Sequence, residues 1–182
     1  VMAAVIKSLQ SQLYATFGEH EKGALLAIQK GDSYAKKNPG HLSIMADTFA
    51  RGISLYAMAR KTKIRLFKMH ASKVHSTIET RGRTGNPTVV HYDKILNAEL
   101  AALQGNVDAA EGWYQSAVVL ASSSGFGKDA ALANERYGEF LLNDMHNASE
   151  AAYKFEAACE LYAEWGAYRK ADALREKYAS LW

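Results

Sequence analysis

Cysteine, proline and long apolar runs are scarce in this sequence. The single cysteine, Cys159, excludes an internal disulfide and is typical of a reducing compartment. The two prolines, Pro39 and Pro87, fall between segments of regular apolar spacing, so neither interrupts a segment. No apolar run approaches the ~20 residues that a membrane-spanning helix needs, and residues 1–20 lack the pattern of a signal peptide. We therefore expect a cytoplasmic protein.

Residue patterns that carry chemistry are equally scarce. His70 and His75 are five positions apart, so they diverge on a helix, and no cysteine or carboxylate lies beside them at metal-ligand spacing. The segment SSSGFGKDAA at 122–131 differs from a phosphate-binding loop at two positions. Ser122 replaces the first glycine, and Asp129 replaces the hydroxyl residue that holds magnesium. We predict no catalytic residue, metal or cofactor, and hence a protein that is not an enzyme.

The charges are divided unevenly along the chain. The net charge is +3, but residues 1–94 carry +9 and residues 95–182 carry −6. Such asymmetry can mark a surface that attracts anions or an acidic partner. It can also let successive parts of a helical array attract one another.

Apolar residues recur every three to four positions through nearly the whole chain, and no segment alternates as a strand does. The clearest stripe, Ile64, Phe67, Ala71, Val74 and Ile78, precedes a predicted loop at 81–87. This pattern predicts an all-α fold. We expect about nine helices, over residues 1–17, 20–37, 41–59, 62–80, 88–104, 107–121, 128–143, 148–165 and 168–181.

A triplet of a small residue, an aromatic four positions later and a small residue three further on occurs twice, 41 residues apart. These spacings place each triplet on one helix face. The small residues let a neighbouring helix approach, and the aromatic ring fills the space between the backbones. A period of this size is typical of stacked helical hairpins. The triplets are Ala110, Tyr114 and Ala117, then Ala151, Phe155 and Ala158.

Three segments between 91 and 178 resemble the tetratricopeptide-like region of large multidomain signalling ATPases. They are HYDKILNAELAALQGNVDAAEGWYQSAVVLASSSGF, ALANERYGEFLL and AAYKFEAACELYAEWGAYRKADALREKY. Those proteins join a kinase-like or AAA-type module to GAF, histidine-kinase or nucleotide-cyclase modules. The resemblance implies a regulatory helical spacer and supplies no catalytic residue. The sequence departs from the family at His146-Asn147, where a glycine is usual, and no motif before residue 85 carries the resemblance.

We therefore expect residues 1–182 to form one tetratricopeptide-like domain, part of a longer protein. Its antiparallel hairpins would form a short right-handed solenoid closed by a C-terminal capping helix. The expected function is a non-catalytic protein–protein interaction or regulatory scaffold module within a multidomain signalling protein. Its partner would be a protein, a peptide or a neighbouring domain of the same chain.

Two surfaces are candidates for binding. In a hairpin array the first helix of each pair lines the concave face, where polar and aromatic side chains can hold a peptide backbone. The alternative for Asn134 and Glu135 is that they brace the neighbouring hairpin. The candidate concave-face residues are Tyr92, Glu99, Asn134 and Arg136.

The second surface is the basic face of residues 60–83, where His75 is expected to lie beside the lysines and arginines. It gives the alternative function, binding of nucleic acid or acidic lipid. Aromatic residues do not interleave with these charges, as a single-strand binder requires. The pattern therefore favours ordinary solvated surface. Among binding functions, it favours an acidic protein partner over nucleic acid or a membrane. The candidate basic patch is Lys61, Arg65, Lys68 and Lys73.

Overall fold

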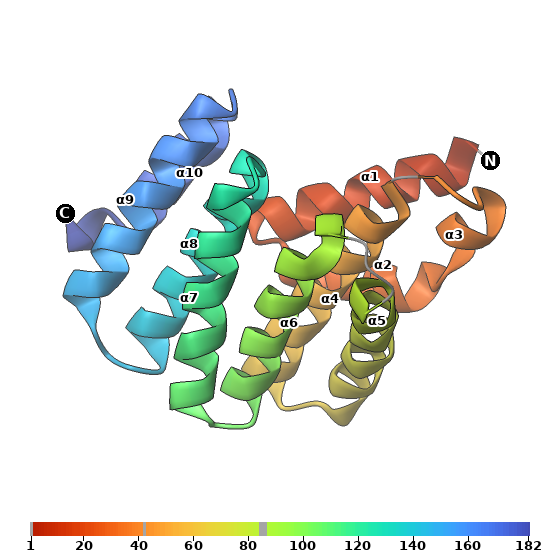
Figure 1. Cartoon of the computed structure of the whole chain (residues 1–182), viewed down its shortest axis with the longest axis horizontal. Coiled ribbons are helices and arrows are strands. Elements are labelled where there is room, and N and C mark those ends of the chain that lie inside the picture. Colours follow the sequence, from red (N-terminus) through yellow and green to blue (C-terminus); the bar gives the residue numbers. More distant parts are fainter. Residues whose placement is uncertain (1, 42, 84–86) are drawn as a thin grey trace. The chain divides into compact units, whose positions relative to one another are not determined.

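A computed structural model describes residues 2–41, 43–83 and 87–182 (Figure 1). Throughout these residues the regular elements are helices, and no strand occurs, which confirms the all-α prediction. In the same ranges, no helix has both the length and the apolar character needed to cross a bilayer. The chain divides into two compact units, Val1–Glu99 and Leu100–Trp182, and each is described by itself.

The first unit is organised around one long, deeply buried helix, α4. Helices α1, α2 and α5 all pack on it. Residues 47–56 of α4 are buried without interruption, as expected for a helix with neighbours on every side. The elements are α1 (Met2–Phe17), α2 (His20–Lys30), α3 (Ser33–Lys37), α4 (Ser43–Thr62), α5 (Arg65–Arg83), η1 (Pro87–Val89) and the first ten residues of α6 (Val90–Leu103).

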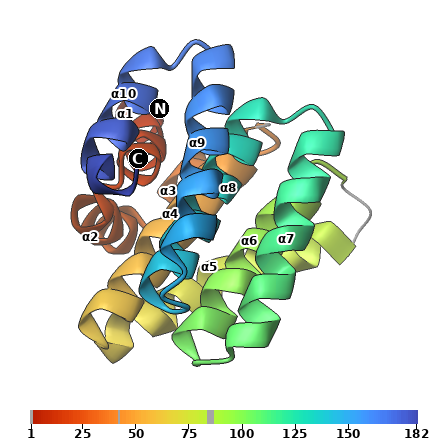
Figure 2. The same cartoon turned by 90° about the vertical axis from the view of Figure 1, so that its left-hand side faces the viewer.

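The second unit is a row of helices in which each packs on the next. Helices α8 and α9 lie side by side in both views (Figures 1 and 2), and α7 and α10 pack on their outer sides. The side chains of Asn106 and Asn147 accept hydrogen bonds from backbone N–H groups in the first turns of α7 and α9, and so cap them. The elements are α7 (Val107–Ser123), α8 (Gly127–Asn143), α9 (Ala148–Glu164), α10 (Tyr168–Lys177) and η2 (Ala179–Leu181).

Both small–aromatic–small triplets lie at helix interfaces and are fully buried, as their spacing predicts. The ring of Tyr114 stacks on Tyr137 with centroids 5.5 Å apart, and Phe155 stacks on Tyr178 at 3.8 Å. A Cβ atom at Gly138 would lie 2.7 Å from the Phe155 ring. The glycine therefore lets α8 approach α9 closely, with the aromatic ring between their backbones.

Several helix boundaries differ from the sequence-based prediction. The helix expected over 20–37 breaks at Gly31, whose positive φ of 49° ends α2, and α3 follows as a separate short helix. Helix α5 continues to Arg83, into the predicted loop at 81–87, of which residues 84–86 lie outside the described part. Ile64 was expected on the inner stripe but is exposed, because α5 begins only at Arg65.

Candidate functional site

Helix α1 has the reverse of the usual surface pattern. Its large apolar side chains lie on one narrow face, separated by four, three, four and four positions, and 48–72% of each is exposed. The opposite face carries small residues and is buried in the unit. The buried face is Ala4, Ser8, Ser11 and Ala15, and the exposed face, the α1 stripe, is Met2, Ile6, Leu9, Leu13 and Phe17.

The α1 stripe is continuous along the whole helix and carries no charge. Leu25 of α2 is also exposed and adds to the apolar surface of the first unit. Surface helices normally direct the apolar face inward and the polar face outward. Single exposed apolar residues need no explanation, but a contiguous apolar stripe of this length is characteristic of an interaction surface.

The predicted basic patch is exposed in the structure. Lys61, Arg65 and Lys68 make no ion pair within the described part of the chain, and the same holds for Lys63 between them. Lys73 is exposed as well. Partial burial acts to raise the pKa of Asp32, but the Arg51 guanidinium and, to a smaller extent, the Lys73 charge lower it. The patch therefore presents basic side chains outside any ion pair where α4 ends and α5 begins.

His75 is not part of this exposed face. The structure buries it, with its Nδ1 3.0 Å from the Tyr56 hydroxyl and its Nε2 3.3 Å from an Asp93 oxygen. It lies between Val74 and Ile78 on the side of α5 that faces the core, so the expectation that it joins the lysines is wrong. The Tyr56 hydroxyl is completely buried, and burial raises its pKa far above the ordinary tyrosine value, so this group of three is structural.

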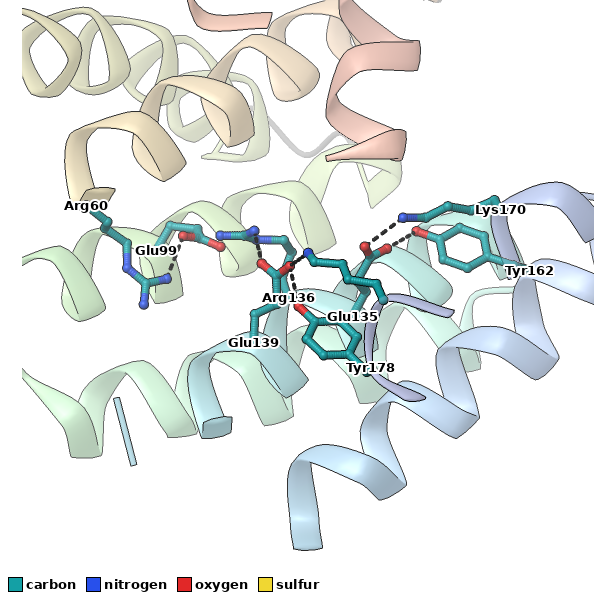
Figure 3. Close-up of polar contacts among 9 residues, drawn as sticks. Arg60, Glu99, Glu135, Arg136, Glu139, Tyr162, Lys170 and Tyr178 are labelled. Atoms are coloured by element: carbon teal, nitrogen blue, oxygen red, sulfur yellow. Dashed lines mark hydrogen bonds and ion pairs between the residues drawn. The ribbon is translucent and has the colours of Figure 1, made fainter. Parts of the chain in front are cut away.

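The four candidate concave-face residues are largely engaged within their own units. Glu99 is fully buried and pairs with Arg60 at 3.1 Å (Figure 3). Tyr92 is half-buried and stacks on Phe49 with centroids 4.1 Å apart. Tyr92 and Glu99 thus both hold α6 to α4.

The two candidates on α8 are buried in the same way. The Asn134 side chain donates to the Ala130 carbonyl at 2.9 Å, and Arg136 forms an ion pair with Glu139. Residues 129–138 of α8 are buried without interruption, so these side chains are not presented on an open groove. This placement corrects the expectation that they are available to a peptide.

Glu135 is the centre of a buried polar cluster between α8 and the last two long helices (Figure 3). It accepts hydrogen bonds from the Tyr162 hydroxyl at 2.8 Å and from the Lys170 ammonium group at 2.7 Å. One turn later, Glu139 accepts from the Tyr178 hydroxyl at 2.9 Å. Burial raises the pKa of Glu135, and the Lys170 charge only partly offsets this. The cluster fixes α9 and α10 on α8, which is the bracing role that the sequence left open for Glu135.

The thiol, the loop-like segment and the metal-ligating side chains that the sequence raised as candidates for chemistry do not form a reactive site in the described residues. Cys159 is buried and its thiol lies 3.6 Å from the Ala171 carbonyl, and burial raises its pKa, which keeps it protonated. Segment 122–131 comprises the end of α7, the turn at 124–126 and the first residues of α8. Over the described residues, no three His, Cys, Asp or Glu side chains gather closely enough to hold a metal ion.

Comparisons with known proteins give no match: no family model, no curated protein and no solved structure corresponds to this chain. The surfaces described above are therefore the features from which a function is inferred.

The sequence-based prediction did not include the α1 stripe. It also did not include Leu66 and Met69, two exposed apolar side chains among the residues of the basic patch. The signal for the stripe was present, because Ala4, Ser8, Ser11 and Ala15 form a second helical stripe opposite the large residues. Two stripes on one helix leave open which of them faces the protein.

Proposed function

We propose that this chain is a non-catalytic protein-interaction or regulatory module, built from tetratricopeptide-like helical hairpins. It would occupy the position of a helical spacer in a multidomain signalling protein. The observation that carries the proposal is the α1 stripe, five large apolar side chains directed outward from an uncharged helix face. A second helix, from a neighbouring domain or a partner protein, is the occupant for which such a face is suited.

The free energy available at this face is substantial. Complete burial of a large apolar side chain contributes about 1.5–3 kcal/mol, so covering five that are already about half-buried contributes about 5 kcal/mol. Association costs offset part of this gain. For a helix belonging to the same polypeptide these costs are smaller, because the chain connection holds the partner nearby.

The architecture of the second unit supports the hairpin interpretation. Its successive helices pack in chain order, and both triplets lie between neighbouring helices. Helical arrays need a polar outer face on their terminal hairpins to remain soluble. The outward face of α1 is apolar instead, which supports a further helix packed against it.

The test is protection of the stripe in the full-length gene product. Leu9→Cys places a thiol on the α1 stripe, and Gln29→Cys places a control thiol on an exposed position of α2. Native Cys159 is buried and contributes little to labelling of the folded protein. We expect a maleimide to label both variants rapidly in the 182-residue chain, and to label position 9 at least tenfold more slowly in the full-length product or its complex.

Equal labelling at positions 9 and 29 in the full-length product and in its complexes would contradict the proposal. Sedimentation velocity over a range of concentrations separates protection by another domain from self-association. Hydrolysis of ATP by the purified chain, retained after repeated chromatography, would contradict the non-catalytic assignment.

A further inference from the structure

The surface around the turn between α4 and α5 combines unpaired positive charge with exposed aliphatic side chains. Residues 60–83 contain eight lysines and arginines and one acidic residue, Glu79. Arg60 pairs with Glu99 and Arg83 pairs with Glu79. The remaining charge is concentrated near the turn. We define the α5 surface as Lys61, Lys63, Ile64, Arg65, Leu66, Lys68 and Met69.

The aliphatic members of the α5 surface are not required by the core. Phe67, Ala71, Val74 and Ile78 fill the inner face of α5 and are buried. Ile64, Leu66 and Met69 are 46–58% exposed, among the basic side chains. Folding alone gives no reason for three large aliphatic residues at these positions.

From this combination we propose that the α5 surface docks on a membrane surface rich in anionic lipid. Its basic side chains would contact the headgroups, while Ile64, Leu66 and Met69 would enter the boundary between headgroups and acyl chains. The association is peripheral, because no described helix can span the bilayer. This proposal does not depend on the α1 stripe, which lies on a different helix.

The positive charge of the α5 surface favours an anionic binding partner. Its exposed aliphatic residues favour anionic lipid over nucleic acid. Phe67 is the one aromatic residue between positions 60 and 83, and it is buried. A surface that binds single-stranded nucleic acid would instead present exposed aromatic side chains for base stacking. Aliphatic groups contribute nothing to phosphate contacts but bind favourably to a lipid interface.

Nearby acidic groups define where the positive surface is strongest. Lys61 lines a hollow that also includes Glu19 and Glu21, and Lys73 lies near Asp32. Lys63, Arg65 and Lys68 make no ion pair with an acidic residue in the described part of the chain. These three charges are therefore the ones to remove.

The experiment measures co-sedimentation of the 182-residue chain with two kinds of vesicle. One contains phosphatidylcholine alone, and the other also contains about 30% phosphatidylserine as the anionic lipid. We expect binding to the anionic vesicles only, weakening as salt rises. Each Lys or Arg contributes about a fivefold factor near such a surface, so Lys63→Gln/Arg65→Gln/Lys68→Gln should weaken binding about 100-fold. The control Lys36→Gln/Lys37→Gln/Arg169→Gln removes the same exposed charge elsewhere and should weaken it less than threefold.

A second variant separates lipid docking from general anion binding. Leu66→Ser/Met69→Ser keeps every charge and should weaken vesicle binding about tenfold while leaving the binding of heparin unchanged. Circular dichroism and thermal unfolding check that each variant is folded. The proposal is overturned if anionic vesicles do not bind at low salt, or if the control triple variant weakens binding as much as the patch variant. An unchanged affinity of the serine variant, or tighter binding to an acidic amphipathic peptide than to vesicles, also overturns it.

Discussion

Helices α1 and α9 both bury small residues against a neighbouring helix, but they treat large side chains in opposite ways. In α9 the aromatic residues Phe155 and Tyr162 are fully buried between the small ones. In α1 the buried face contains alanines and serines, and residues such as Leu9 and Leu13 point outward. Helix α9 therefore contributes its apolar area to the folding of this chain. Helix α1 leaves its apolar area exposed, which is the basis of the docking role proposed for it.

The comparison predicts its largest difference at Phe155. Phe155→Ala should lower the free energy of unfolding by about 3–5 kcal/mol, because the variant loses buried area and leaves a cavity beside Tyr178. Leu9→Ala is the matched truncation on α1, where the side chain is already more than half exposed, and should cost about 0.5 kcal/mol or less. Urea unfolding followed by circular dichroism measures both values. Similar losses at the two sites would contradict the contrast between α1 and α9.

The Glu135 cluster should give the next largest effect. Glu135→Leu leaves the buried Lys170 ammonium without its partner and should cost about 3 kcal/mol. Replacing both residues, as in Glu135→Leu/Lys170→Met, should recover a large part of that loss, since no uncompensated charge remains buried. Equal stability of the single and double variants would contradict this recovery.

The same cluster has a predictable pH dependence. Because burial raises the pKa of Glu135 in the folded state, the folded protein holds a proton there more strongly than the unfolded chain does. This contribution is complete below the ordinary glutamate pKa and is lost as the pH rises through the raised folded value. The stability of the wild type relative to Glu135→Leu should therefore fall as the pH rises above about 4.5. A rise over that interval would mean that the folded pKa is lowered instead.

The sequence predicts the parts of this structure that depend on local spacing. The triplets around Tyr114 and Phe155 identify two helix interfaces, since a small–aromatic–small pattern has one favourable arrangement. The break at Gly31 was missed because the apolar pattern continues across it. The outward direction of Leu9 was missed because large residues normally define the buried face, and here the small stripe does.

The pairing of polar residues that lie far apart in the chain could not be predicted from local spacing. Glu99 and Arg60 are 39 positions apart, and Glu135 and Lys170 are 35 apart. Their pairing depends on how helices stack, which no local pattern specifies. Side chains that looked suited to a peptide, such as Arg136, are therefore buried and engaged within the fold.

The close approach of α8 and α9 at Gly138 predicts the smallest of these stability changes. Gly112 provides a matched control, because it is a helical glycine with open space around it. Gly138→Ala would place a Cβ 2.7 Å from the Phe155 ring and should cost about 1–3 kcal/mol through overpacking. Gly112→Ala, on the exposed side of α7, meets nothing within 4 Å and should raise stability by about 0.5–1 kcal/mol, because alanine favours the helix. In Gly138→Ala/Phe155→Leu the smaller leucine replaces the ring, so the alanine should cost less stability than it does beside phenylalanine. The stability changes of the two substitutions should therefore be non-additive. Thermal and urea unfolding of the wild type, these three variants and Phe155→Leu measure the effects. If Gly138→Ala stabilises as Gly112→Ala does, the α8–α9 interface has space for an additional methyl group, and the close packing of Phe155 against Gly138 is contradicted.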